Sequence, residues 1–150
     1  MEPHPLTGSS AWPVSEQSPS GQYSEHVVVT AELKSGRAIR EALERAYRCV
    51  TVETEAAQDF TLAVSEAFSN AICHGCSKPT DHINVWLTVC AEYGQVRLEY
   101  RGEPFHLSAP CLPDDGSTNG RGRYLMKILA DQVDYEFAGG WTRARLRKSW

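Results

Sequence analysis

The stretch Leu62-Ala-Val-Ser-Glu-Ala-Phe-Ser-Asn-Ala-Ile-Cys-His-Gly75 sets Glu66, Asn70 and His74 four residues apart. In an α-helix this spacing stacks a carboxylate, an amide and an imidazole on one face. Most other side chains of the stretch are apolar, so we expect a largely buried helix whose polar groups need partners. A carboxylate that accepts a proton and an amide oxygen that holds a hard cation are components of a nucleotide-phosphate site.

The composition fits one globular domain, with 150 residues, 41% of them hydrophobic, and a net charge of -4. The mild acidity gives no electrostatic case for binding nucleic acid or an anionic membrane. No apolar run approaches the ~20 residues that span a bilayer, and the N-terminus lacks the pattern of a secretory signal. The five cysteines are scattered and odd in number, which is typical of free intracellular thiols. We therefore expect a cytoplasmic protein.

Residues 1–24 differ in composition from the rest of the chain. They carry four prolines, and five serines by position 20, with little apolar pattern. This composition predicts a flexible N-terminal arm. The folded domain is expected over residues 25–150.

Apolar periodicity predicts the remaining elements. Strands are expected at 26–32, 83–89, 96–100, 133–137 and 142–148, and helices at 39–50, 54–74 and 120–131. Strands joined mostly by hairpins, with helices between them, predict an α+β fold. The expected architecture is a two-layer sandwich, with helices on one face of a mixed, mostly antiparallel sheet.

Charged side chains alternate with apolar ones in two of the predicted strands: Arg97, Glu99 and Arg101 in one, and Arg143, Arg145 and Arg147 in the other. Such alternation predicts sheet positions with one solvated face. For Arg143, Arg145 and Arg147, the alternative interpretation is a surface that binds a partner protein. Trp86 also alternates with apolar residues and is expected on the side of the sheet away from the core.

Two further motifs point to phosphate chemistry. Asn119-Gly-Arg-Gly122 opens a predicted helix, whose N–H groups and positive dipole end favour an anion, and whose glycines allow close approach. Arg121 between the glycines could form paired hydrogen bonds with a terminal phosphate. Gly102-Glu-Pro-Phe105 directly follows a predicted strand and begins a long loop over 102–119, a length that is often functional.

Together these motifs resemble those of a known family. The order is Ser-Glu-Ala-x-x-Asn-Ala-x-x-His, a strand ending in Gly-x-Pro-Phe, Gly-Arg-Gly opening a helix, and Asp-x-Val. It resembles the anti-sigma factor serine/threonine kinases, which belong to the GHKL (Bergerat) group of histidine kinase-like ATPases. The resemblance extends over about residues 25–148.

The resemblance implies a role for each matching residue. Glu66 would be the general base that takes the proton of a protein serine, and Asn70 would hold Mg²⁺ on the ATP phosphates. Gly120 and Gly122 would line the phosphates, and Arg121 would stabilise the transferring phosphoryl group. These roles meet the general requirements of phosphoryl transfer, which are positioning, a metal, a cation and a base.

The resemblance also implies an adenine pocket, in which this chain departs from the family. Gly102 would approach the adenine, residues 106–119 would form a lid, and His74 is grouped with the nucleotide contacts, although a histidine at a helix end is more often a cap. The family has an aspartate for the adenine amino group where this chain has Tyr100. Strand alternation predicts that Tyr100 points inward, where it could stack on the base or fill its site.

The implied activity is that of an anti-sigma factor and ATP-dependent serine/threonine kinase. It would phosphorylate an anti-anti-sigma (STAS-domain) protein, bind a sigma factor and so regulate transcription by partner switching, as a homodimer. The alternative is a binding module of the same fold that has lost its nucleotide and acts by sequestration. A fragment of a sensor histidine kinase is a weaker third interpretation.

Overall fold

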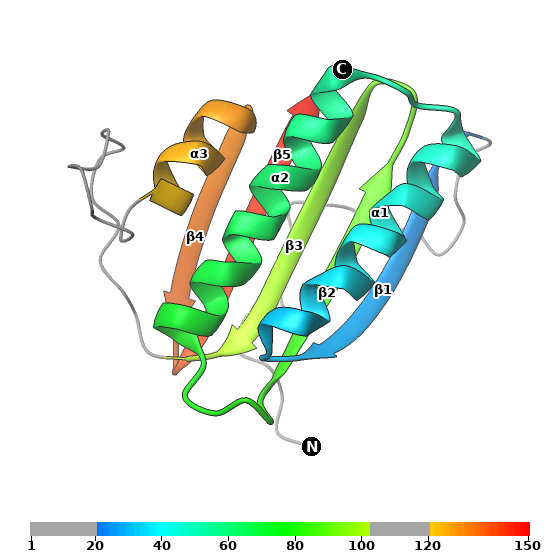
Figure 1. The fold of residues 1–150 in the computed structure, drawn as a ribbon. Helices are drawn as coiled ribbons and strands as arrows, with labels where there is room; N and C mark the ends of the chain where they lie inside the picture. The colour runs from blue at the N-terminus through cyan, green and yellow to red at the C-terminus, as the bar shows by residue number, and fades with distance from the viewer. Residues whose placement is uncertain (1–20, 103–120) are drawn as a thin grey trace.

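In the described residues, 21–102 and 121–150 of a computed structural model, five strands form one sheet with three α-helices on the same face (Figure 1). The elements in chain order are β1 (Tyr23–Thr30), the 3-10 turn η1 (Leu33–Ser35), α1 (Gly36–Val50), α2 (Glu55–Asn70), the π-helical turn η2 (Ala71–Gly75), β2 (His82–Val89), β3 (Tyr93–Arg101), α3 (Arg121–Leu129), β4 (Gln132–Ala138) and β5 (Trp141–Ser149). This arrangement confirms the predicted two-layer α+β fold.

The sheet has the order β1-β2-β3-β5-β4. Each of the four described strand pairs is antiparallel, so the predicted parallel component is not found among them. The hairpins β2–β3 and β4–β5 form as expected. The two hairpins are joined in the sheet because β5 pairs with the central strand β3. The first strand begins at Tyr23, inside the predicted arm, and ends at Thr30, two residues earlier than expected.

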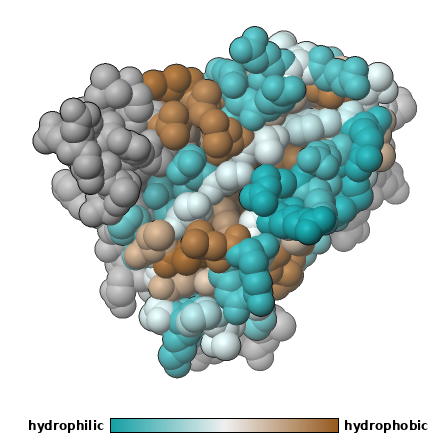
Figure 2. Space-filling view, in the orientation of Figure 1, coloured by the Kyte–Doolittle hydropathy of each residue, from teal (hydrophilic) through white to brown (hydrophobic). Residues whose placement is uncertain are grey.

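The helix layer buries an apolar core against the sheet. The start of α2 is fixed by Thr54, whose side chain accepts a hydrogen bond from the Ala57 N–H at 3.1 Å. The largest fully buried apolar side chains are Tyr100, Phe60, Ile39, Leu43, Ile83, Leu87, Leu98, Met126 and Leu146. On the helix-covered side of the molecule, hydrophobic residues gather in patches that polar stretches separate (Figure 2).

The opposite face of the sheet carries the alternating charged residues, and their predicted solvation is wrong in its centre. Only 7% of Arg97, 1% of Glu99 and 2% of Arg143 is exposed. These side chains are paired, because Glu99 accepts a hydrogen bond from Arg143 at 2.7 Å and lies 3.1 Å from the Arg97 guanidinium. Trp86 lies on this face, as predicted, beneath the Arg97 guanidinium.

Candidate functional site

The polar ridge predicted on the long helix forms for its first two members. Glu66 and Asn70 lie one turn apart in α2, so they share a face. Glu66 is half-buried, and burial is the cause that raises the pKa of its carboxyl group. Asn70 is 9% exposed, and its Nδ2 has no hydrogen-bond partner among residues 21–102 and 121–150. A buried amide with an unused donor is costly, so this end of α2 is suited to receive a polar ligand.

His74 lies beyond the end of the α-helix. The helix ends at Asn70, and Ala71–Gly75 form a π-helical turn closed by the Cys76 N–H on the Ala71 carbonyl at 2.7 Å. The imidazole is exposed, whereas Asn70 is buried. The α-helix predicted over 54–74 therefore ends four residues early, and the last member of the predicted ridge lies in the turn that follows it.

Tyr100 points inward, as strand alternation predicts, and is fully buried. Its ring lies against Gly75, where an added Cβ would come within 2.3 Å of the ring carbon Cε2. Its hydroxyl oxygen has no hydrogen-bond partner within the described part of the chain, and burial raises the pKa of this phenol well above its usual value. The ring thus fills the space between η2 and the end of β3.

The two glycines at this end allow the backbones to meet. A Cβ on Gly102 would lie 2.2 Å from the Gly75 carbonyl oxygen, so neither position has room for a larger residue. The Gly102 N–H donates to the Gly140 carbonyl at 2.9 Å. Gly75, Gly102 and Gly140 also line a cavity of about 340 Å³ that reaches Arg101 and Asp81.

The register of the last hairpin adds three residues that the sequence did not single out. Thr142 pairs with Tyr100 across β3 and β5 and is fully buried, and its hydroxyl also has no hydrogen-bond partner among the residues that the structure describes. Tyr135 and Phe137 on β4 are stacked, with ring centroids 6.2 Å apart. The Tyr135 hydroxyl contacts the Met126 sulfur of α3 at 3.7 Å. Their alternation in the sequence was a usable signal, but their proximity to Tyr100 depends on long-range strand pairing.

The third helix, which carries part of the predicted phosphate turn, lies in the same layer as α2. α3 packs beside α2 (Figure 1), and its first residues are Arg121 and Gly122. Gly120 and the predicted lid over 106–119 lie outside the described residues, as does the side chain of Arg121.

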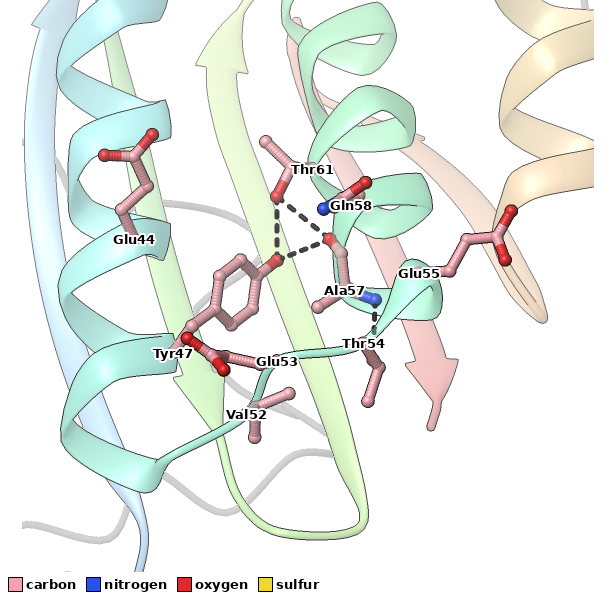
Figure 3. A pocket seen from close by; sticks show the side chains of 9 residues that line it. All are labelled: Glu44, Tyr47, Val52, Glu53, Thr54, Glu55, Ala57, Gln58 and Thr61. Atoms are coloured by element: carbon pink, nitrogen blue, oxygen red, sulfur yellow. Dashed lines mark hydrogen bonds between the residues drawn. The ribbon is translucent and has the colours of Figure 1, made fainter.

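A larger cavity, of about 770 Å³, lies near the start of α2, away from this region (Figure 3). The Tyr47 hydroxyl at its wall lies 3.0 Å from the Ala57 carbonyl and 2.9 Å from the Thr61 hydroxyl, and burial raises the pKa of Tyr47 to about 12. Neither of the two cavities is lined by Glu66 or Asn70.

Comparison with known proteins identifies the domain. Residues 29–148 match the histidine kinase-like ATPase domain. The chain belongs to this family. No curated protein matches the sequence of this ATPase domain.

Two solved structures resemble the ATPase domain at low sequence identity. The RsbU and RsbW domains of Rv1364c from Mycobacterium tuberculosis superpose with a TM-score of 0.63 and 18% identity, over 85% of this chain and 33% of that chain. The histidine kinase domain of the blue-light activated histidine kinase from Erythrobacter litoralis EL346 gives a TM-score of 0.49 and 17% identity, over 80% of this chain and 61% of that chain. This chain therefore spans a third of the first protein and less than two thirds of the second.

Membership of this family implies ATP as the ligand, usually with Mg²⁺, and the residues present fit that ligand. Among the described residues Nδ2 of Asn70 has no hydrogen-bond partner, and because the two ends of an amide exchange places by a flip, Asn70 can present its oxygen there instead. The buried hydroxyls of Tyr100 and Thr142, which also find no partner in the part of the chain that the structure describes, can serve a polar ligand. Within the described residues, no helix has both the length and the apolar character to cross a bilayer.

Proposed function

We propose that this chain is an anti-sigma factor and an ATP-dependent serine/threonine kinase of a STAS-domain protein. The observation that supports it best is the pair on α2, a half-buried Glu66 one turn from the buried Asn70, whose Nδ2 has no hydrogen-bond partner among the described residues. α3, which begins with Arg121 and Gly122, packs against α2 in the same layer. In this proposal the protein also binds a sigma factor and so regulates transcription by partner switching. It acts in the cytoplasm as a homodimer.

The chain's own residues divide the work of phosphoryl transfer. When bound, Mg-ATP supplies the phosphoryl group and neutralises its charge. Glu66 accepts the proton of the incoming serine hydroxyl, and its raised pKa brings the carboxyl closer to the range of an effective base. Asn70 would hold the metal through its amide oxygen. As the resemblance implies, Arg121 and Gly122 at the start of α3 would contribute a guanidinium and N–H groups to the phosphates.

The kinase is tested by mixing the purified full chain with Mg-ATP and its cognate STAS protein, and by following the phosphate by mass spectrometry. Glu66→Gln should abolish transfer while the far-UV circular dichroism is unchanged. Glu44→Gln, an exposed carboxylate on α1 with the same change in chemistry, is the matched control and should leave transfer intact. Transfer by Glu66→Gln at the rate of the control variant would remove Glu66 from the role of base.

The second candidate is a binding module that has lost its nucleotide, and the full burial of Tyr100 favours it. A tyrosine cannot supply the charged acceptor expected for the adenine amino group. Loss of a hydrogen bond to a charged group costs ~1.5–3 kcal/mol, which is roughly a 10- to 100-fold loss of affinity. Calorimetric titration with Mg-ATP separates the two candidates. Binding in the micromolar range eliminates the module, and no binding up to millimolar ATP eliminates the kinase.

A further inference from the structure

The helix-facing side of the β3–β5 pair ends in two hydroxyl groups. The strand register sets apolar residues opposite each other as far as Leu98 and Ala144, and the next inward pair is Tyr100 and Thr142. Both residues of this pair are fully buried, and no hydrogen-bond partner for either hydroxyl is found in the described chain. Directly opposed residues on one face of a sheet are neighbours, with Cβ atoms ~4.5–5.5 Å apart. Phenylalanine and valine would fill the same space without two unpaired polar groups, so packing alone does not account for this pair.

Both members of the pair are neutral hydroxyls that keep their protons. Burial raises the pKa of the Tyr100 phenol well above its usual value, and the nearby Tyr135 and Cys76 raise it further. Thr142 carries an aliphatic hydroxyl. A neutral hydroxyl both donates and accepts hydrogen bonds, and its hydrogen rotates to suit the partner. The pair can therefore meet either a donor or an acceptor on a ligand.

We propose that Tyr100 and Thr142 allow this site to bind a purine nucleotide that carries either a 6-amino or a 6-oxo group. The inference rests on the proposed function, which makes a purine nucleoside triphosphate the ligand. Toward a 6-amino group the hydroxyls accept a hydrogen bond, and toward a 6-oxo group they donate one. A carboxylate at position 100 is an acceptor only, so it would favour the amino group and reject the oxo group. Tyr100 is thus the residue that removes the selection for adenine.

The burial of the two hydroxyls in the ligand-free protein affects the affinity for a purine but not the selectivity between purines. A base reaches the hydroxyls only after the protein atoms that cover them have moved, and that movement costs free energy. The cost is the same for two purines of similar size, so it weakens both by one factor and cancels in the ratio of their affinities. The ratio of the two dissociation constants is therefore the quantity that reports on Tyr100.

Calorimetric titration of the full chain with Mg-ATP and with Mg-ITP tests the proposal. Inosine carries the 6-oxo group but lacks the 2-amino group of guanosine, so the comparison isolates the 6-position. The two dissociation constants should agree within about fivefold. A larger preference for either nucleotide overturns this inference and leaves the proposed kinase standing. No binding of either nucleotide up to millimolar concentration overturns both.

Removal of the phenol hydroxyl shows whether position 100 contacts the base. Tyr100→Phe keeps the ring and should weaken the binding of ATP and ITP by the same factor, roughly 3- to 10-fold, because each loses one hydrogen bond to a neutral group. Tyr47→Phe is the matched control. The Tyr47 hydroxyl lies at the wall of the larger cavity near the start of α2, so its removal should leave both affinities unchanged. Unchanged affinities in the Tyr100 variant as well, or a loss for only one nucleotide, would contradict the assigned contact.

Substitution of Tyr100 by an acceptor provides the converse measurement. Tyr100→Asp should raise the preference for ATP over ITP to at least about tenfold, because a carboxylate accepts from the 6-amino group and cannot donate to the 6-oxo group. Tyr100→Asn is the matched control, since asparagine has the same shape but both donates and accepts, and should keep the preference within about fivefold. Equal preferences in the two variants overturn the inference. Should far-UV circular dichroism show that these variants do not fold, the Tyr100→Phe measurement decides alone.

Discussion

Substitution of Gly75 by alanine tests the packing that defines the base end of the site. The added Cβ would lie 2.3 Å from Cε2 and 3.0 Å from Cδ2 of the Tyr100 ring. An ordinary contact needs about 1 Å more than the shorter of these distances. The ring is fully buried and rigid, so it cannot yield by swinging into solvent. Gly75→Ala is therefore an overpacking substitution.

The expected loss follows from two opposing terms. Overpacking a well-packed core costs ~1–3 kcal/mol, and a clash with a buried ring belongs at the upper end of that range. Alanine in place of a helical glycine returns ~0.5–1 kcal/mol. The net loss of unfolding free energy is ~1–2 kcal/mol, measured by urea unfolding. For a domain of this size it lowers the Tm by roughly 2–8 °C.

Gly36→Ala is the matched control for this loss. Its nearest non-bonded atom is Nη1 of Arg40 at 3.2 Å, the free end of a flexible side chain, so we expect no loss or a small gain. A double-mutant cycle of Gly75→Ala with Tyr100→Ala should show a coupling of ~1–2 kcal/mol, because the smaller side chain removes the clash. Equal stability of the Gly75 and Gly36 variants, or a coupling of zero, would refute the assigned packing.

Two further predictions concern buried polar groups. Tyr100→Phe removes a buried hydroxyl that has no hydrogen-bond partner, so it should raise the urea-unfolding free energy by ~1 kcal/mol; a loss of similar size would reveal a partner. The raised folded-state pKa of Glu66 means that the folded protein holds the Glu66 proton more tightly than the unfolded chain, so this group destabilises the fold as pH rises through that pKa. Glu66→Gln should therefore stabilise the protein more at pH 7 than at pH 4, and an equal effect at both values would contradict the raised pKa.

Local patterns were enough to predict most of the fold. Alternation placed Tyr100 on the inner face, and helical spacing placed Glu66 and Asn70 together, because each pattern depends on residues within one element. The order of strands and helices followed in the same way. A π-turn has no such signature, since Ala-Ile-Cys continues the apolar character of α2, and this is why the predicted α-helix ran on past Asn70 to His74.

Long-range pairing accounts for what the sequence could not predict. In the sequence, Thr142 is only one polar residue of a C-terminal strand. The pairing of β3 with β5 places it beside Tyr100. The burial of Glu99 and Arg143 likewise depends on residues more than forty positions apart meeting across that pair. Alternation shows that one face of a strand is polar, but it does not show whether another part of the chain covers that face.

The central strand β3 has one further consequence for folding. Its inward residues Val96, Leu98 and Tyr100 are apolar, its outward residues Arg97 and Glu99 are charged, and all five are buried in the folded protein. Sliding β3 by one position against β2 or β5 would drive Arg97 and Glu99 under the helices and expose Leu98 and Tyr100. A shifted pairing of β3 therefore carries two costs, the burial of charged groups under the helices and the exposure of apolar side chains. For this reason β3 fixes the register in which β2 and β5 pair with it.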